Sequence, residues 1–365
     1  RFGGTVTDMS LVFGTKGELD HDITYDVSLN LGQNEVDFAI SNTINPSLGP
    51  ETPTEFSPGR YTQSEQTLDI DFTKPFDVGL YEPLFVATGF QYRNESYESF
   101  AGDTASYEIG PLATQGFGIG SNGFPGLAAN SQGRVSRNNI ALYIDAEAYI
   151  TENFMLAGAL RYEDFSDFGD TTKGKIAFRW QALENIAFRG AFSTGFKAPT
   201  LGQSNVRNVT TAFGTGGELI DRATLPPTDP VSQLKGGEQL TPEESESITF
   251  GVVADFDNGL FITADYYNIE LTDRISTASG IALTEEDIAT LLEQGINDAS
   301  SFSEISFFTN DFDTTTEGVD VVANYSMDMM GGETKFSLAY NWTSTEVDRA
   351  SDNISDFRIR MLEDN

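Results

Sequence analysis

Cysteine is absent from the 365-residue sequence, and histidine occurs once, at His21. Without cysteine the sequence offers no disulfide framework, no thiol nucleophile and no Cys/His zinc site. A single histidine makes Ser-His-Asp catalysis a poor expectation. No apolar run approaches the ~18 residues that a transmembrane helix needs. Because no other pattern points to a reaction, we expect a protein that is not an enzyme and has no catalytic residues.

Basic residues are scarce as well. Lys and Arg number 21 against 56 Asp and Glu, which gives a formal net charge of −35. A polyanionic surface repels nucleic acid, so we expect no nucleic-acid partner. The charge is otherwise compatible with solubility, with salty surroundings, or with acidic loops that bind divalent cations.

The sequence does contain a regular alternation of apolar and polar residues, which places successive side chains on opposite faces of a β-strand. In segment 22–31, Ile23, Val27 and Leu31 share one face, whereas Asp22 and Asp26 share the other. Such patterns predict about twelve strands, over residues 8–14, 22–31, 66–73, 83–93, 139–149, 155–163, 174–181, 185–194, 247–256, 260–271, 317–325 and 334–342.

The connections between these strands alternate in length. Turns such as Asp257-Asn258-Gly259 and Met330-Gly331-Gly332 join strands in pairs. Long polar segments join the pairs, with one short exception at 164–173: they cover about 32–65, 94–138, 195–246 and 272–316. Short turns at one end and long loops at the other are typical of an outer-membrane β-barrel. Several strands also reach the ~9–11 residues of a tilted membrane strand, so we predict an all-β, antiparallel transmembrane barrel.

One segment is predicted to be helical. In TEEDIATLLEQ, residues 284–294, Thr284 is placed to cap the helix with Asp287 three residues on, and Ile288, Leu291 and Leu292 share one face. A short helix inside a long loop is expected to serve packing rather than chemistry.

Three stretches of the sequence resemble the β-barrel of TonB-dependent outer-membrane receptors. Residues 160–203 end in Gly195-Phe196-Lys197-Ala198-Pro199, like the family's Gly-Phe-(Arg/Lys)-Ala-Pro. Residues 240–275 open with LTPEES, like its Leu-x-Pro-Glu-x-Ser strand. Residues 307–325, FFTNDFDTTTEGVDVVANY, are similar to its asparagine-rich approach to a Gly-x-(Asp/Glu) strand. The three stretches occur in the family's order.

The resemblance implies a 22-stranded barrel closed by an N-terminal plug domain. Such receptors import ferric siderophores, cobalamin, haem or oligosaccharides with energy from the inner-membrane TonB complex. No plug precedes Arg1 and no terminal aromatic strand follows, so we expect residues 1–365 to be one partial barrel domain. The partners expected are the TonB complex, through the missing plug, outer-membrane lipid and an unidentified small molecule. The expected location is the outer membrane of a Gram-negative bacterium, and no cofactor is expected.

Basic residues on the polar strand faces are candidates to line the lumen and to contact a plug or the ligand path. The alternative is the scattered salt bridging of any wide, wet barrel. These candidates are Arg161, Arg179, Arg189 and Lys197. In the motif formed by Gly195, Phe196, Ala198 and Pro199, we expect Gly195 to permit an unusual backbone angle and Pro199 to end the strand.

Ligand contact is expected in the long loops and at their bases. The aromatic and amide candidates there are Tyr97, Phe100, Tyr107, Phe117, Phe124, Asn205, Asn208 and Phe213. The segment GFGIGSNGFPG, residues 116–126, either covers a ligand or is only a loop tip. The acidic runs 164–170 and 310–313 offer oxygen ligands for calcium, although solvated acidic loops are the commoner explanation.

Two other functions stay open on the sequence alone. A passive outer-membrane channel would share the barrel pattern. A soluble secreted all-β binding protein or glycoside-active enzyme would share the alternation, because a sandwich also has one wet face.

Overall fold

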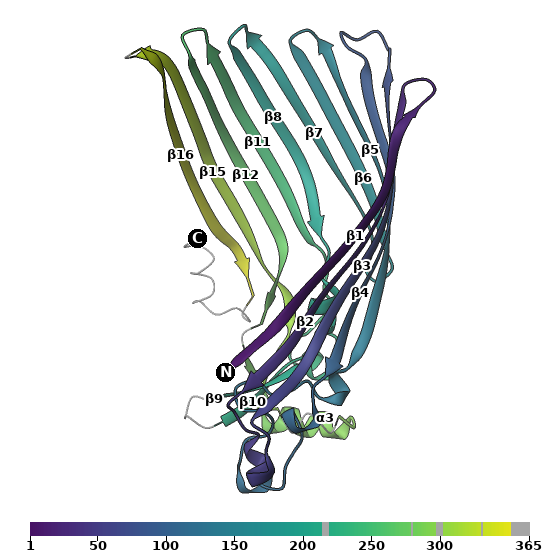
Figure 1. Ribbon diagram of the computed structural model, residues 1–365, viewed down its shortest axis with the longest axis vertical. Helices are drawn as coiled ribbons and strands as arrows, with labels where there is room; N and C mark the ends of the chain where they lie inside the picture. Colours follow the sequence, from purple (N-terminus) through teal and green to yellow (C-terminus); the bar gives the residue numbers. More distant parts are fainter. Residues whose placement is uncertain (214–218, 279, 297–301, 330, 352–365) are drawn as a thin grey trace.

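The computed structural model describes residues 1–213, 219–278, 280–296, 302–329 and 331–351. Twelve antiparallel strands form one curved sheet in the order β1-β2-β3-β4-β5-β6-β7-β8-β11-β12-β15-β16 (Figure 1). Their bounds are β1 Phe2–Leu19, β2 Ile23–Ser41, β3 Glu55–Phe76, β4 Leu84–Ala101, β5 Gly133–Thr151, β6 Phe154–Phe165, β7 Gly169–Leu183, β8 Ile186–Lys197, β11 Glu243–Phe256, β12 Leu260–Thr277, β15 Phe308–Met329 and β16 Gly332–Ala350. The predicted antiparallel all-β class and its twelve strands are confirmed. Closure into a full barrel stays a prediction.

The connections lie as the sequence predicts, with short turns at one end of the sheet and long segments at the other (Figure 1). We call these the turn end and the loop end. At the turn end Gly259 has a φ of 83°, and the Asn258 side chain accepts the N–H of Leu260 at 3.1 Å. This is the turn chemistry that the Asp-Asn-Gly sequence predicts.

The strands are much longer than predicted, and the loop bounds taken from the sequence are wrong. β3 alone has 22 residues. The segments between strands at the loop end shrink to 42–54, 102–132, 166–168, 198–242 and 278–307. Alternation shows only where one face is apolar. The hydrogen-bonded ladder continues beyond that band, where the outward face is no longer consistently apolar, so the periodic signal ends before the strand does.

One face of the sheet is apolar and open to the surroundings. On β5, β6 and β7, Leu142, Leu160 and Ile176 are 53%, 59% and 54% exposed. The apolar positions of β5 run from Ile140 to Ile150. At ~3.4 Å per residue and a tilt of about 45°, that stretch covers roughly 25 Å, the height of the apolar band of an outer-membrane barrel. The opposite face is polar.

Glycines on the polar face let side chains reach across a strand. Arg189 on β8 donates from Nε and Nη2 to both carboxylate oxygens of Asp265 on β12, at 2.8 and 2.7 Å, although β11 lies between them. Gly251 of β11 lies beneath this pair, and a Cβ there would be 2.0 Å from Asp265 Oδ1. Two further crossings repeat the arrangement: Tyr143 reaches Asp71 over Gly89, and Tyr267 reaches Thr343 over Gly318.

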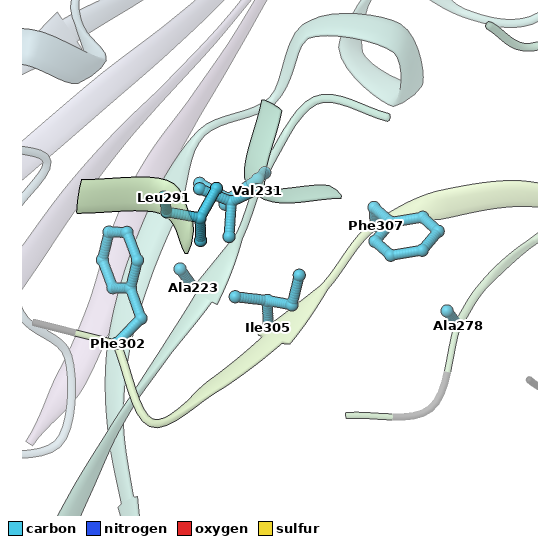
Figure 2. Packing of buried hydrophobic residues seen from close by; sticks show 8 residues of the cluster. Ala223, Val231, Ala278, Leu291, Phe302, Ile305 and Phe307 are labelled. Atoms are coloured by element: carbon cyan, nitrogen blue, oxygen red, sulfur yellow. The ribbon is translucent and has the colours of Figure 1, made fainter. Parts of the chain in front are cut away.

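Two loop segments fold together into a small unit that we call the loop subdomain. It contains a second sheet of β9 Asn208–Phe213, β10 Leu219–Thr224, β13 Ile281–Ala282 and β14 Glu304–Ser306, with helices α2 Pro230–Leu234 and α3 Glu285–Glu293. Leu225, Val231, Leu291, Ile305 and Phe307 are buried in its core (Figure 2). The sequence does not predict this sheet, because strands of two to six residues are too short for a periodic signal.

The predicted helix is confirmed as α3. Thr284 caps it, since its side chain accepts the N–H of Asp287 while the Asp287 side chain accepts the N–H of Thr284. Among the described residues, the remaining helical turns are α1 Leu201–Asn205 and four 3₁₀ turns: η1 Pro46–Glu51, η2 Thr104–Ser106, η3 Ala113–Gln115 and η4 Ala129–Ser131. In the part of the chain described here, no helix is long and apolar enough to cross a membrane.

Candidate ligand site at the loop end of the sheet

The Gly195 to Pro199 motif forms the end of β8. Lys197 Nζ lies 3.3 Å from Glu243 Oε2, the glutamate of the Leu-x-Pro-Glu-x-Ser motif on β11. The other oxygen of Glu243 accepts the N–H of Ile275 at 2.8 Å. The expectation of an unusual backbone angle at Gly195 is wrong, because its φ is not positive. Its missing side chain instead leaves room for Ser245 Oγ, which would lie 2.6 Å from a Cβ.

Arg137 on β5 binds the last residue of the motif. Only 5% of its side chain is exposed, and its Nε and Nη2 donate to Glu95 at 2.9 and 2.6 Å. Its Nη1 donates to the carbonyl oxygen of Pro199 at 2.8 Å and lies 3.4 Å from Asp167. The guanidinium also faces the Phe165 ring at 5.3 Å. The sequence did not single out Arg137, because its main partner lies 42 residues away in the chain.

Helix α1 then lies against the polar face of β4 and β5. Thr200 and Gln203 form its capping box. A Cβ added to Gly202 would be 3.7 Å from the Tyr97 ring, so the helix passes close to that side chain. Asn205, a ligand candidate, donates from Nδ2 to the carbonyl of Leu201 at 2.9 Å and so serves the helix itself.

A cavity of about 490 Å³ lies between α1 and strands β1 to β5. The Asn34 amide donates to Asp8 at 2.6 Å, and Thr67 Oγ1 donates to Glu65 at 3.0 Å. The cavity is therefore polar, with amide, hydroxyl and carboxylate groups. The lining side chains that matter for ligand chemistry are Asp8, Asn34, Gln63, Glu65, Glu95, Arg137 and Thr200.

Five aromatic rings, which we call the aromatic ladder, continue from this region toward the loops. Tyr97 stacks on Tyr61 with ring centroids 5.6 Å apart, and Tyr61 meets the edge of Phe38 at 5.7 Å. Phe38 packs on Phe124 at 5.2 Å, and Phe124 on Phe2 at 4.7 Å. The ladder joins the candidates Tyr97 and Phe124. The sequence could not predict the other three as partners, because only the fold brings their strands to segment 116–126.

Segment 116–126 packs on an earlier part of its own loop, 102–132, and on the loop 42–54. Ser121 is fully buried, and its N–H donates to the carbonyl of Ser106 at 2.9 Å. The N–H of Asn122 donates to the carbonyl of Ile44 at 2.9 Å. Gly120 and Gly123 have φ values of 78° and 97°, which permit the tight folding. Whether the segment covers a ligand stays a prediction.

The other loop candidates lie apart from the cavity. Phe100 carries the guanidinium of Arg60 4.1 Å from its ring centroid. Phe117 is 48% exposed, and Tyr107 is half-buried after η2. Asn208 begins β9 in the loop subdomain. Phe213 ends that strand, and the side chain of Phe213 lies outside the described part of the structure.

The lumen candidates all have polar partners on the sheet. Arg161 donates to Glu163 at 2.6 Å and to Gln91 at 2.9 Å. Arg179 on β7 lies opposite Arg189 on β8 in the strand register, and it donates a hydrogen bond to Gln181 at 2.7 Å. Lys197 is 63% exposed despite its contact with Glu243. Contact with a plug or ligand stays a prediction for all four.

The acidic runs also have protein partners. Asp167 faces Arg137, and Asp313 lies 2.6 Å from Arg349. Asp311 accepts the hydroxyl of Thr309 at 2.9 Å. No group of three or more His, Asp or Glu arranged to hold a metal occurs within the described residues. Calcium binding by these runs stays an alternative to the expectation of no cofactor.

Comparison with known proteins gives one sequence relative and several structural ones. The ferric enterobactin receptor PirA of Pseudomonas aeruginosa is 30% identical over 140 residues, which are 38% of this chain and 18% of that protein. A mutant of the ferric enterobactin receptor PfeA of P. aeruginosa has a TM-score of 0.60 at 16% identity, over 94% of this chain and 43% of that one. The siderophore receptor PirA of Acinetobacter baumannii has a TM-score of 0.61 at 12% identity, over 93% of this chain and 45% of that one. The RagAB peptide transporter has a TM-score of 0.55 at 12% identity, over 97% of this chain and 38% of that one.

The chain thus spans less than half the length of each of these proteins. At such low identity the solved structures establish the fold alone. The family profile described as TonB dependent receptor-like, beta-barrel matches residues 4–360. This match covers nearly the whole chain, and the three motifs that resemble the family lie on β6 to β8, β11 to β12 and β15. The protein therefore belongs to the TonB-dependent receptor β-barrel family, whose members are transporters and not enzymes.

Proposed function

We propose that this chain forms part of the wall of an outer-membrane receptor that imports a ferric siderophore with energy from the TonB complex. Family membership is the observation that carries the proposal. A siderophore is favoured over other ligands because the sequence relative and two structural neighbours are named as ferric enterobactin or siderophore receptors.

The geometry supports the same function. The exposed apolar face suits contact with lipid, and the polar face suits a water-filled lumen. The cavity and the aromatic ladder lie at the loop end, where a ligand would arrive from outside the cell. The long loops, unlike the short turns, offer enough side chains to contact a ligand.

The test uses the full-length receptor in its own outer membrane. Cells grown under iron limitation are given radiolabelled iron in a panel of ferric siderophores, with and without the gene. We expect accumulation of at least one chelate that requires both the gene and an intact TonB protein. A protonophore that collapses the inner-membrane potential should abolish it.

Two outcomes would contradict the proposal. A passive channel would give ligand-independent conductance in planar bilayers and uptake that survives loss of TonB. A soluble secreted protein would be recovered from the aqueous fraction without detergent.

A further inference from the structure

The basic side chains at the loop end are largely occupied by carboxylates of the chain itself. Arg137 is held by Glu95, Asp167 and the carbonyl of Pro199. Lys173 lies 2.9 Å from Glu244 on β11. Ion pairs of Arg60 on β3, Arg222 on β10, Lys235 after α2 and Arg349 on β16 extend the pattern into the loops. At these side chains, a ligand that needed cations would have to compete with the carboxylates.

The cavity has a negative charge of its own. Its lining contains the carboxylates of Asp8, Glu65 and Glu95 and one guanidinium, that of Arg137, for a net charge of 1 − 3 = −2. Glu65 is exposed and has a threonine hydroxyl as its partner. Arg137 is almost completely buried, and four of its five N–H groups donate to Glu95, Asp167 and the carbonyl of Pro199. The groups left to meet a ligand are carboxylates, amides and hydroxyls.

The aromatic ladder adds a second feature that favours positive charge. Ring faces attract cations through the quadrupole of the π system, and they pack equally well on flat apolar groups. The ladder begins at Tyr97, on the same strand as Glu95, and at Tyr61, on the same strand as Glu65. An anionic ligand would meet repulsion from the cavity and no attraction from the rings.

We propose that this cavity binds a ferric chelate of neutral or positive net charge, of the tris-hydroxamate type. The inference rests on the proposed function and narrows its ligand class. Three hydroxamates carry one negative charge each and balance Fe(III), so a free amine on the chelate makes it a cation. Three catecholates carry two negative charges each, so their complex with Fe(III) has a net charge of −3. The cavity discriminates against the catecholate by charge, which separates this chain from relatives named for ferric enterobactin.

The experiment measures equilibrium binding to the full-length receptor in outer-membrane preparations. The probes are ferrioxamine B, which is a cationic tris-hydroxamate, ferrichrome, which is a neutral one, and ferric enterobactin, which is a tris-catecholate. We expect ferrioxamine B to bind at least about tenfold more tightly than ferric enterobactin, from Coulomb attraction in a partly desolvated cavity. Tightest binding of ferric enterobactin would overturn the inference and leave the proposed function intact. Binding of no ferric chelate would overturn both.

Glu65→Gln tests whether this cavity is the site. The variant keeps the side-chain shape and removes one charge, so the affinity for ferrioxamine B should fall about three- to tenfold while that for ferrichrome changes little. The control is Glu98→Gln, which removes the same charge one residue from Tyr97 and therefore on the other face of β4. Equal effects of the two variants, or no effect of Glu65→Gln, would place the ligand elsewhere. Heat-dependent gel mobility checks that both variants are folded.

Discussion

At the scale of single residues, the polar face of the sheet is held by side chains that reach a partner two strands away. Arg189 and Asp265 form a bidentate ion pair over Gly251. Exposed ion pairs usually contribute little to the stability of a fold. Here the bidentate geometry over a glycine holds both side chains in one orientation. The sequence presents Gly251 only as one of 35 glycines, and its role follows from the register of three strands.

Gly251→Ala is expected to destabilise the sheet by about 1–3 kcal/mol, because the new methyl group would collide with the Asp265 carboxylate and push the ion pair apart. Urea titration of the detergent-folded, full-length protein measures the free energy of unfolding. Gly158→Ala is the matched control, since the nearest atom to its Cβ would be the Lys175 carbonyl oxygen at 3.8 Å. Equal losses for the two variants would contradict the explanation.

At the scale of elements, the loop subdomain shows what local sequence can predict. α3 is predictable because its capping box and apolar face lie within eleven residues. β10 and β14 are not, because Ala223 pairs with Ile305 from another loop. No local pattern reports that partner. The two loops fold as one unit because neither can bury its apolar residues alone.

Leu291→Ala is expected to loosen the loop subdomain by about 2–5 kcal/mol, since Leu291 is fully buried in its core. Hydrogen exchange should rise in residues 222–234 and 281–296, whereas β5 and β6 keep their protection because this core lies outside the main sheet. Leu292→Ala is the control, because that neighbour is 43% exposed. Loss of protection throughout the main sheet would show that the two parts do not fold separately.

Low pH should also destabilise the loop subdomain. A hydrogen bond from Lys235, with further ones from Thr284, lowers the pKa of Asp287 from its ordinary 3.8 to about 2. The depressed pKa means that the contact stabilises the fold above the ordinary value and is lost as pH falls toward the lower one. We expect exchange of α3 amides, corrected for intrinsic rate, to be steady at pH 5 and to rise between about pH 4 and 2. Asp287→Asn should lack that rise; an identical acid response would contradict the assignment.

At the scale of the whole molecule, the exposed apolar face and the unequal connections predict an orientation for the proposed outer-membrane barrel. The loop end should face the outside of the cell and the turn end the periplasm. Thr114 lies exposed in the loop segment 102–132, and Asn258 lies exposed in the turn between β11 and β12.

A membrane-impermeant maleimide should therefore label Thr114→Cys in intact cells, and Asn258→Cys only after the outer membrane is opened. The sequence contains no cysteine of its own, so each variant introduces one thiol here. The unsubstituted full-length receptor gives the background. Labelling of Asn258→Cys alone would reverse the orientation, and labelling of both in intact cells would argue against a membrane barrel.

The sequence by itself determined the twelve strands of the main sheet, their antiparallel class, the alternation of short turns with long loops, the helix after residue 284 and the family motifs. Each of these depends on neighbours in the chain: alternating faces, a turn or a cap. Only the tertiary structure decided the true strand lengths, the loop subdomain, the burial of Arg137 beside Glu95 and the aromatic ladder from Tyr97 to Phe2. The physical reason is separation along the chain. These contacts join residues on different strands and loops, and their energy appears only once the sheet sets the register between them.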